Sequence, residues 1–592
     1  MKIYDELGYL LSDLDCDPLY NCNVTHKEIE KSLEGYIFSQ SGWRSILAQS
    51  KDENDRSCDI LNADKIIASN IARAFFEYLG KRNPTIVLAR DARPTGRALQ
   101  DICARILISL GADVRLLSIS SAPETMCYLK DKSDAFFYIS ASHNPIGYNG
   151  FKFGSNGGVF DKQAFDEIEK IFKRMVLSED YSDSVVSLSA SLQKDAYREV
   201  LENHLNEKRK SIESYRKFVL KTANAKESFA VPFGIVADFN GSARSSSNDM
   251  SFLSSLGAKV WSVNERPGQI EHGIVPEGEN LELCKKTLSK VHKLDNNFIL
   301  GYVPDNDGDR GNFVFVNNRG NASILDAQNV FALIASIEMA DQVIKKEKRP
   351  AIAVNGPTSQ RVDEIASIIG VDVFRSDIGE SNVVALAKKL RGEGYSVHVC
   401  GEGSNGGIIA NPARVRDPMN SIMSIAKLYS VHGLYALLLE SLSKYKNKRD
   451  VSLATLISSL PSYTTTPAFS KDAVLRIKCP DFDLLKLEYE RLFLSEVNGY
   501  LTEGLAQYEI RQYEGTNEEI GIGIEHRPKK SQGGYKVIFY DNFMKFKASL
   551  WFSKSRTEPV MRVMVDVKGD NKNLHDKLLS WQRSLVLRAD NA

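Results

Sequence analysis

The feature that most constrains the fold is a helix exit that recurs three times after an apolar strand. Its copies read Leu110-Gly111-Ala112-Asp113-Val114, Leu256-Gly257-Ala258-Lys259-Val260 and Ile369-Gly370-Val371-Asp372-Val373. Glycine suits the left-handed end of a helix, and the valine that follows starts a strand. The apolar strands upstream are expected at residues 85–89, 235–237 and 351–354. The pattern predicts three similar α/β domains, with three unrelated strand–helix–strand units as the alternative.

The last part of the chain has a different pattern. Strands expected at residues 535–539 and 546–550 flank glycine-rich turns and favour a fourth, α+β domain. A chain of 592 residues is too long for a single core. We expect domains at residues 1–190, 191–320, 321–445 and 446–592. Within the first, residues 1–35 read as a helical, acidic lead-in without an assigned role, and residues 177–227 read as a polar helical cover or link.

Charge and cysteine usage exclude some classes of partner. Lys plus Arg and Asp plus Glu both number 76, so no basic excess favours nucleic acid or an anionic membrane. The eight cysteines include no CxxC pair, which is typical of a reduced cytoplasmic protein. The acidic N-terminus does not read as a signal peptide, and no apolar run approaches the roughly 20 residues of a membrane span.

Four loops carry candidate chemistry, and the first follows the apolar residues 135–139. We call Ser140-Ala141-Ser142-His143-Asn144-Pro145 the serine loop. Ser142 is the candidate reactive hydroxyl, and it needs a base or a cation to activate it. His143 and Lys152 are the nearest such groups in sequence. A Ser-His pair in isolation is usually a structural turn, so the other loops decide the interpretation.

The second, which we call the acidic loop, reads Asp305-Asn306-Asp307-Gly308-Asp309-Arg310 between two expected strands. Three carboxylates so close together repel one another unless a cation lies among them. An EF-hand does not fit, because Arg310 stands where that loop needs glycine and Val316 where it needs glutamate. The set therefore favours Mg²⁺, with a solvated acidic turn as the alternative.

The remaining two loops are weaker signals. In the glycine loop, Gly401-Glu402-Gly403-Ser404, a carboxylate and a hydroxyl could bind neighbouring sugar hydroxyls, although a plain glycine turn reads the same way. A further polar loop containing Gly379 lies nearby in sequence. The basic loop, residues 553–562, combines hydroxyls with two or three cations, as a phosphate site does. A basic surface turn is the alternative there.

Taken in order, the four loops resemble those of the α-D-phosphohexomutase superfamily of phosphoglucomutases and phosphomannomutases. Ser41-Gly42-Trp43-Arg44 is similar to that family's N-terminal arginine motif, and Asn149-Gly150-Phe151-Lys152 to the motif that carries its basic residue. The resemblance spans about residues 36–570. It implies an α/β fold of three similar domains with mixed sheets and a C-terminal α+β domain around a central cleft.

The resemblance also implies an activity: transfer of a phosphoryl group between O1 and O6 of a hexose, glucose or mannose, through phosphoserine at Ser142 and a hexose 1,6-bisphosphate. The bisphosphate is the implied activator, Mg²⁺ the implied cofactor, and hexose phosphates the implied partners of a monomer or homodimer. The implied roles divide the residues into four groups. They are Ser142, Asp305, Asp307 and Asp309 for the metal; Ser142, His143, Lys152, Arg44 and Arg310 for catalysis; Glu402, Ser404 and Gly379 for the sugar; and Lys554, Ser555, Arg556, Thr557 and Arg562 for the distal phosphate.

Within this scheme His143, Arg44 and Arg310 are expected to add positive charge. Lys152 is expected to shuttle a proton, with a pKa lowered by neighbouring cations. The chain departs from the family pattern at three places: Ser553 replaces an arginine, Asn405-Gly406-Gly407 replaces a common Gly-His, and Ser381 replaces a common lysine. A phosphoglucosamine mutase, a weakened sugar-phosphate-binding protein and a Mg²⁺ phosphatase therefore stay open as alternatives.

Overall fold

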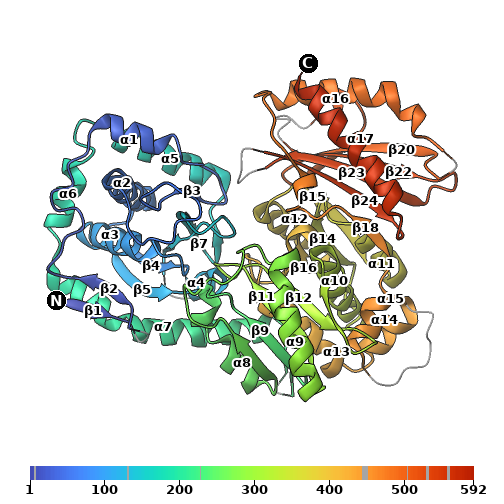
Figure 1. Ribbon diagram of the computed structural model, residues 1–592, viewed down its shortest axis with the longest axis horizontal. Helices are drawn as coiled ribbons and strands as arrows, with labels where there is room; N and C mark the ends of the chain where they lie inside the picture. The colour runs from blue at the N-terminus through green and yellow to red at the C-terminus, as the bar shows by residue number, and fades with distance from the viewer. Residues whose placement is uncertain are drawn as a thin grey trace.

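The computed structural model describes most of the chain, namely residues 1–5, 8–129, 133–226, 228–442, 451–502, 504–527, 533–555 and 560–591. Figure 1 shows an N-terminal lobe on the left, a second domain below the centre, a third at the right and a fourth above it. Each is built on its own sheet. The predicted class, three α/β domains with mixed sheets and a C-terminal α+β domain, is confirmed.

The sheet of the N-terminal lobe is mixed and buried on both faces. Its strand order is β3-β7-β6-β4-β5, with β8 paired to β7. The strands are β3 (Trp43–Ile46), β4 (Thr85–Arg90), β5 (Asp113–Ile119), β6 (Ala135–Ile139), β7 (Tyr148–Ser155) and β8 (Gly158–Val159). Along β6, Phe137 and Ile139 join one core and Phe136 and Tyr138 join another. This explains why the strand before the serine loop is a continuous apolar run.

Helices cover the two faces of this sheet. The cluster that contains Phe137 also holds residues of α2 (Asn62–Leu79), α3 (Gly96–Ser109) and α5 (Lys162–Val176). The cluster on the other face holds residues of α4 (Ala122–Leu129). The sheet is thus held rigidly, and the loops that follow its strands are presented at its edge.

The second and third domains repeat the same unit with fewer strands. Their sheets have the orders β10-β9-β11-β12-β13 and β15-β14-β16-β17. The strands are β9 (Gly234–Asp238), β10 (Lys259–Val263), β11 (Phe298–Pro304), β12 (Gly311–Val316), β13 (Ala322–Leu325), β14 (Pro350–Asn355), β15 (Asp372–Ser376), β16 (Ser396–Gly401) and β17 (Ile408–Ala410). The predicted helix exits are confirmed, because Gly111, Gly257 and Gly370 all have positive φ, at 93°, 93° and 86°.

The helices of the second and third domains lie between and around these sheets. They are α8 (Asp249–Ser255), α9 (Glu282–Leu294), α10 (Ala327–Ile344), α11 (Arg361–Ile369), α12 (Glu380–Gly392), α13 (Pro418–Ser430), α14 (Leu434–Leu442) and α15 (Leu453–Ser459). No helix in the described ranges is by itself long and apolar enough to cross a membrane; only α13 and α14 together, bent by 95°, pass that test on length and composition.

The fourth domain is an antiparallel sheet covered by two helices. Its order is β18-β24-β23-β22-β20-β21, with β19 paired to β24. The strands are β18 (Tyr463–Thr465), β19 (Val474–Leu475), β20 (Gln507–Glu514), β21 (Asn517–Ile520), β22 (Tyr535–Tyr540), β23 (Phe546–Lys554) and β24 (Met561–Lys568). Helices α16 (Phe482–Glu496) and α17 (Lys572–Asp590) share one core with the sheet.

Two elements extend past the limits expected for their domains, at residues 190 and 320. Strand β13 pairs with β12, so the second sheet continues beyond residue 320. The helical link expected before residue 227 is α6 (Asp183–Ala190) followed by α7 (Lys194–Thr222), and α7 packs against α4 and β5 of the N-terminal lobe. The second and third domains also share one continuous core cluster. Strand pairing places β13 in the second sheet, and packing between units places α7 on the N-terminal lobe; local pattern reveals neither.

The helical interpretation of residues 1–35 is wrong for its first half. The chain starts with an antiparallel hairpin, β1 (Lys2–Tyr4) with β2 (Leu10–Asp13), and only α1 (His26–Leu33) is helical. Ser12 Oγ donates to Asp101 of α3 at 2.8 Å, and Arg105 donates to the carbonyl oxygen of Asp13 at 2.9 Å. Contacts with α3, far along the chain, therefore stabilise the hairpin over a local helix.

Arg244 links three parts of the molecule. Its Nη2 donates to the carbonyl oxygen of Gly308 in the acidic loop at 2.8 Å, and its Nη1 donates to the hydroxyl of Tyr215 on α7 at 2.6 Å. The same guanidinium pairs with Asp417 before α13 and with Asp249. Because its side chain is fully buried, the carboxylates of Asp417 and Asp249 depend on its charge for compensation.

We predict that Arg244→Met lowers the free energy of unfolding by about 3–5 kcal/mol, because the buried Asp417 and Asp249 lose their counter-charge. Thermal and urea unfolding of the full chain measure the effect. Arg319→Met, at an exposed arginine of the same domain, is the matched control and should change stability little. Equal unfolding curves for the two variants would contradict the role given to Arg244.

Candidate active site

The serine loop leaves β6 in a strained conformation. Ser142 has φ 51°, in the left-handed region that few residues other than glycine adopt. Its backbone N–H donates to Ser140 Oγ at 2.8 Å, and its side chain lines a cavity between the domains with only 2% of its surface exposed. The loop is therefore held in one shape before any ligand arrives.

Arg93, in the turn after β4, holds that shape. Its Nη2 donates to the carbonyl oxygens of Ser142 at 2.8 Å and Asn144 at 2.6 Å, and its Nη1 to that of Tyr148 at 2.9 Å. Asp91 accepts from Arg93 Nε at 3.2 Å. Sequence analysis assigned no role to Arg93. Its only signal was an arginine in a turn at the end of a strand.

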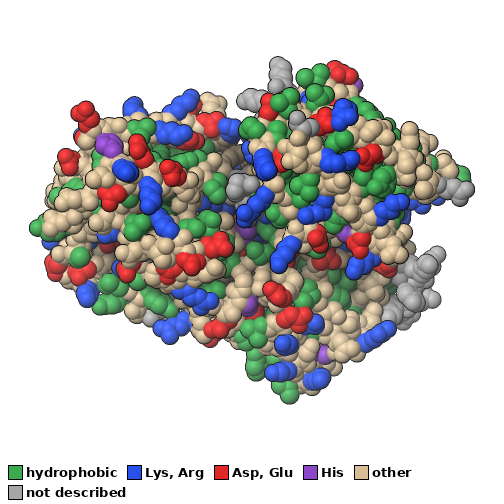
Figure 2. Space-filling model, turned by 45° about the horizontal axis from the view of Figure 1, so that its top comes forward, with side chains coloured by type: hydrophobic (Ala, Val, Ile, Leu, Met, Phe, Trp, Pro, Cys, Tyr) green, Lys and Arg blue, Asp and Glu red, His purple; other side chains and the backbone are tan. Residues whose placement is uncertain are grey.

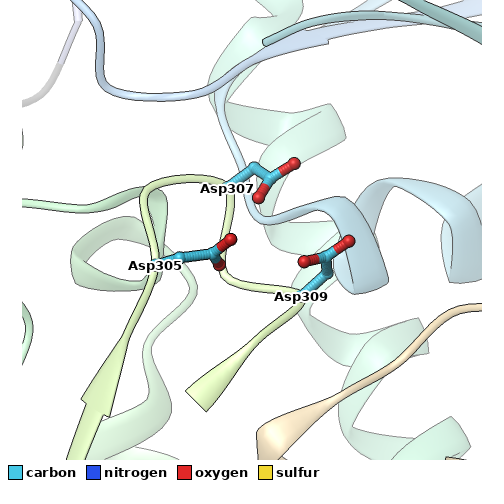
Figure 3. A group of neighbouring side chains, drawn as sticks. All are labelled: Asp305, Asp307 and Asp309. Carbon is cyan, nitrogen blue, oxygen red and sulfur yellow. The ribbon is translucent and has the colours of Figure 1, made fainter. Parts of the chain in front are cut away.

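The three aspartates of the acidic loop point into one space (Figure 3). They are buried, and one ligand atom from each lies within 4.8 Å of the others. Burial raises the pKa of Asp305 well above its usual value, and the charges of Asp307 and Asp309 raise it further. Burial would also raise the pKa of Asp307, but Lys152 outweighs it and the pKa of Asp307 is lowered. This concentration of negative charge favours a bound cation.

The acidic loop fits a magnesium ion. Among the described residues, Asp307 Oδ1 and Asp309 Oδ1 are buried without a hydrogen-bond partner, so each has a lone pair that a cation could take. All three ligands are oxygens, the type that Mg²⁺ prefers. Ser142 Oγ donates to Asp305 Oδ2 at 3.3 Å, and Ser140 Oγ to Asp307 Oδ2 at 3.3 Å. The structure thus brings the serine loop and the acidic loop together.

Lys152 and Arg44 surround these acids with positive charge. Lys152 Nζ donates to Asp307 Oδ2 at 2.5 Å. Burial would lower the pKa of Lys152, but Asp307 and Asp309 outweigh it, so its pKa is raised. The expectation of a lowered pKa at Lys152 is wrong for this arrangement. Arg44 donates to Asn144 Oδ1 at 2.9 Å, and burial lowers its pKa to about 10.

His143 does not supply the positive charge expected of it. Burial holds its pKa well below the usual value, and Arg310 and Arg44 lower it further. Its imidazole is therefore neutral. The Nδ1 atom is buried with no hydrogen-bond partner among the described residues. His143 lines the cavity as a neutral polar group.

The glycine loop reaches the cavity from the third domain. Glu402 and Ser404 line it together with Gly379. Glu402 Oε1 accepts from Asn355 Nδ2 at 2.9 Å and from the backbone N–H of Gly379 at 2.8 Å. Burial would raise the pKa of Glu402, but the charges of Arg416 and Arg310 and the hydrogen bonds from Gly379 and Asn355 together outweigh it, so the carboxylate has a lowered pKa.

Arg416 connects the glycine loop to the acidic loop and was missed by sequence analysis. Its Nη1 donates to Glu402 Oε2 at 2.8 Å and its Nη2 to Asp309 Oδ2 at 3.3 Å. Glu380 lies 3.6 Å from the same guanidinium. No local motif marks Arg416, because its three partners come from distant segments of the chain.

The basic loop contributes a wall from the fourth domain. Ser553, Ser555 and Arg562 line the cavity beside Trp551, whose Nε1 donates to Ser553 Oγ at 3.2 Å. Lys554 is exposed and is not among the lining residues, because alternate residues of β23 face opposite sides of the sheet. Arg556 and Thr557 lie outside the described residues, so the structure does not place these two expected phosphate ligands.

Phe469 is a third residue that sequence analysis missed. The guanidinium carbons of Arg310 and Arg562 lie 5.6 and 5.2 Å from the centre of its ring, and the His143 ring packs edge-on against it at 5.2 Å. Arg562 Nη1 also donates to the carbonyl oxygen of Ala468 at 2.5 Å. Phe469 therefore orients two cations that come from different domains.

All four loops open into this one cavity between the N-terminal lobe and the other domains. Gln40 Nε2 donates to Ser381 Oγ at 3.0 Å across it. Figure 2 shows basic side chains gathered along the seam between the lobe on the left and the rest of the molecule. A phosphorylated ligand would meet guanidinium groups on opposite walls, a hydroxyl and a metal site in the same space.

We predict that Arg416→Met moves the acid limb of the pH profile of kcat/KM upward by about one pH unit or more. Without Arg416, only the Gly379 N–H, Arg310 and Asn355 oppose the effect of burial on the pKa of Glu402, so this carboxylate protonates at a higher pH and is lost to ligand binding there. Arg414→Met, at an exposed arginine of the same segment, is the control. If the acid limb of Arg416→Met stays at the wild-type pH, protonation of Glu402 does not cause that limb and the prediction is wrong.

Comparison with known proteins gives consistent matches. Two family models match: phosphoglucomutase/phosphomannomutase α/β/α domain I at residues 36–178, and domain III at residues 326–447. A phosphoglucomutase/phosphomannomutase of Thermococcus kodakarensis is 28% identical over 65% of this chain and 78% of its own length. A phosphoglucosamine mutase of Methanocaldococcus jannaschii is 26% identical over 55% of this chain and 65% of its own length.

Solved structures show the same fold. A phosphoglucomutase/phosphomannomutase family protein from Burkholderia thailandensis superposes with a TM-score of 0.59 over 93% of this chain and 97% of its own, at 16% identity. The open form of the Paramecium phosphoglucomutase parafusin gives 0.57 over 94% and 96%, at 14% identity. At these identities the likeness concerns the fold alone.

Proposed function

This chain belongs to the α-D-phosphohexomutase superfamily, a group of intramolecular phosphotransferases, and from that premise we propose that it interconverts hexose 1-phosphates and hexose 6-phosphates. The observation that carries the proposal is the contact of Ser142 Oγ with Asp305 at 3.3 Å, in a cavity with guanidinium groups on opposite walls. A reactive hydroxyl, a cation site and two anion-binding surfaces are the parts that phosphoryl transfer requires.

In the proposed reaction, phosphorylated Ser142 gives its phosphoryl group to a hydroxyl of the bound hexose phosphate. The bond from phosphorus to Ser142 Oγ breaks, and a bond to the oxygen at C1 or C6 forms. Lys152, which carries its proton in this arrangement, can supply that proton to the Ser142 oxygen and take another from the sugar hydroxyl. The bisphosphate then turns over and returns its other phosphoryl group to Ser142.

The cation that Asp305, Asp307 and Asp309 would hold is Mg²⁺, which neutralises charge on the transferred phosphoryl oxygens. Ser142 lies beside this site, so its phosphoryl oxygen could complete the ligand set. Arg44 and Arg310 add fixed positive charge around the same oxygens. Arg310 is stacked on Phe469, which limits the directions its guanidinium can take.

For the substrate we propose glucose or mannose phosphate, with a hexose 1,6-bisphosphate as activator. Glu402 and Ser404 are the proposed partners of the sugar hydroxyls, and Arg416 is the first of several groups that lower the pKa of Glu402. A glucosamine phosphate is the alternative, because several relatives, among them the one from Methanocaldococcus jannaschii, carry the name phosphoglucosamine mutase. We further propose a cytoplasmic enzyme that acts as a monomer or homodimer.

We predict that Ser142→Ala lowers mutase activity by about a thousandfold or more, because the variant lacks the hydroxyl beside Asp305 that would carry the phosphoryl group. A coupled assay over glucose, mannose and glucosamine 1-phosphates, with the matching 1,6-bisphosphate, measures turnover and ranks the substrates. Ser191→Ala, on an exposed site, is the control.

Three outcomes of that assay would contradict the proposal. Near-normal turnover by Ser142→Ala would remove the proposed nucleophile. Release of free phosphate without isomerised product would identify a phosphatase. Phosphorylation of wild-type Ser142 without any turnover would identify a sugar-phosphate-binding protein, an alternative that Ser553 at the family's arginine position favours.

We predict that Arg562→Ala raises KM for hexose phosphate about tenfold, as loss of one charged hydrogen bond does. Lys554→Ala is the matched test on the same loop, and its exposed position outside the cavity predicts a much smaller change. Steady-state kinetics on both variants decide the matter. A larger effect at Lys554 would mean that this side chain turns into the cavity when ligand binds.

A further inference from the structure

A second pocket lies outside the cavity, where three separate segments meet. The N-terminal hairpin contributes Tyr9, the end of β4 and the start of α3 contribute Arg90 and Arg97, and a loop of the second domain contributes Arg266. Its lining contains four arginines, counting Arg93, and no Asp or Glu. Such an excess of one charge in a concave site is typical of anion binding.

Two of these arginines carry an unfavourable charge. Arg90 is 4% exposed, and burial lowers its pKa to about 10; Asp5 and Asp91 oppose this effect, and Arg97 adds to it. Arg97 has no hydrogen bond or ion pair to any described residue. It stands in the first turn of α3, at the helix end where a negative charge is favourable and a positive charge is not. An anion between Arg90 and Arg97 would relieve both costs.

The third arginine is held in place by the N-terminal hairpin. Arg266 Nε donates to the hydroxyl of Tyr9 at 3.0 Å, and its guanidinium carbon lies 5.7 Å from the centre of the Tyr9 ring. The same hydroxyl donates to the carbonyl oxygen of Pro267 at 3.1 Å. Tyr9 therefore orients Arg266 without neutralising it, and this gives residues 1–35 a role.

We propose that this pocket is a second anion-binding site, for a small phosphorylated metabolite that is distinct from the substrate in the cavity. A guanidinium group can bind two phosphate oxygens at once. Three such groups therefore suit a phosphate dianion better than they suit a ligand with a single carboxylate. The proposal is independent of the proposed reaction, because no residue of the mechanism is needed to bind this anion.

The pocket also touches the support of the serine loop. Arg93 lines the pocket and donates to the carbonyl oxygens of Ser142 and Asn144. Asp91, which accepts from Arg93, offers its carbonyl oxygen to Arg90 Nη1 at 3.2 Å. A bound phosphate would thus lie against the residues that hold the reactive loop in shape, so its binding should stabilise that loop.

The exposed thiol of Cys58 lines the pocket and reports on its occupancy. We expect inorganic phosphate, at constant ionic strength set with chloride, to slow alkylation of Cys58 by iodoacetamide in a saturable way. Mass spectrometry follows each site, and exposed Cys16, outside the pocket, is the internal control. Equal rates at Cys58 with and without phosphate, or equal slowing at Cys16, would overturn the proposal.

Arginine variants test whether phosphate protects Cys58 by binding in this pocket. In Arg97→Gln/Arg266→Gln, half-maximal protection of Cys58 should need about tenfold more phosphate. Arg266→Gln alone, on an exposed loop, gives the same test with less risk to folding, and Arg319→Gln should keep wild-type protection. Protection that persists in both pocket variants would overturn the assignment, as would equal protection by acetate, which would identify a carboxylate site.

Hydrogen exchange tests the link to the serine loop. Phosphate should slow exchange of the amides of residues 140–148 more in the wild-type chain than in Arg97→Gln/Arg266→Gln. Equal slowing in the two chains would mean that the effect comes from phosphate in the cavity, and it would overturn the link through Arg93.

Discussion

The structure depends on how negative charge is balanced at its centre. Asp305, Asp307 and Asp309 are buried, and one carboxylate oxygen of each lies within 4.8 Å of the others. The three groups cannot all stay ionised without cations. Lys152 and Arg416 pair with two of them, and each comes from a different domain. A bound magnesium ion would neutralise part of the same negative charge. The convergence of the domains is thus also the condition for keeping these acids charged.

Buried arginines also connect separate segments around this centre. Arg244 joins the acidic loop to α7 and α13, Arg93 holds the serine loop, and Arg416 joins the acidic loop to the glycine loop. The planar guanidinium suits these positions, because it can donate to several carbonyl or carboxylate oxygens at once while keeping its charge when buried. Each of the three binds groups that are distant in sequence, so the site exists only in the assembled molecule.

Much of the fold could be predicted from local pattern. The recurring glycine exits predicted three α/β units, and the positive φ of Gly111, Gly257 and Gly370 agrees with the reason given for them. The N-terminal hairpin and the end of the second sheet at β13 could not be predicted. Partners remote in sequence, Asp101 and Arg105 for the hairpin and β12 for β13, decide those elements.

The sequence by itself determined which chemical groups the four loops offer, because a hydroxyl, three carboxylates and several cations follow strands whose ends must lie at a sheet edge. Only the tertiary structure decided how those groups behave. Burial beside arginines leaves His143 neutral, two carboxylates keep Lys152 charged, and the alternation of β23 turns Lys554 away from the cavity. The charge state of a side chain and the direction in which it points depend on its neighbours in the folded molecule, and the local sequence does not reveal those neighbours.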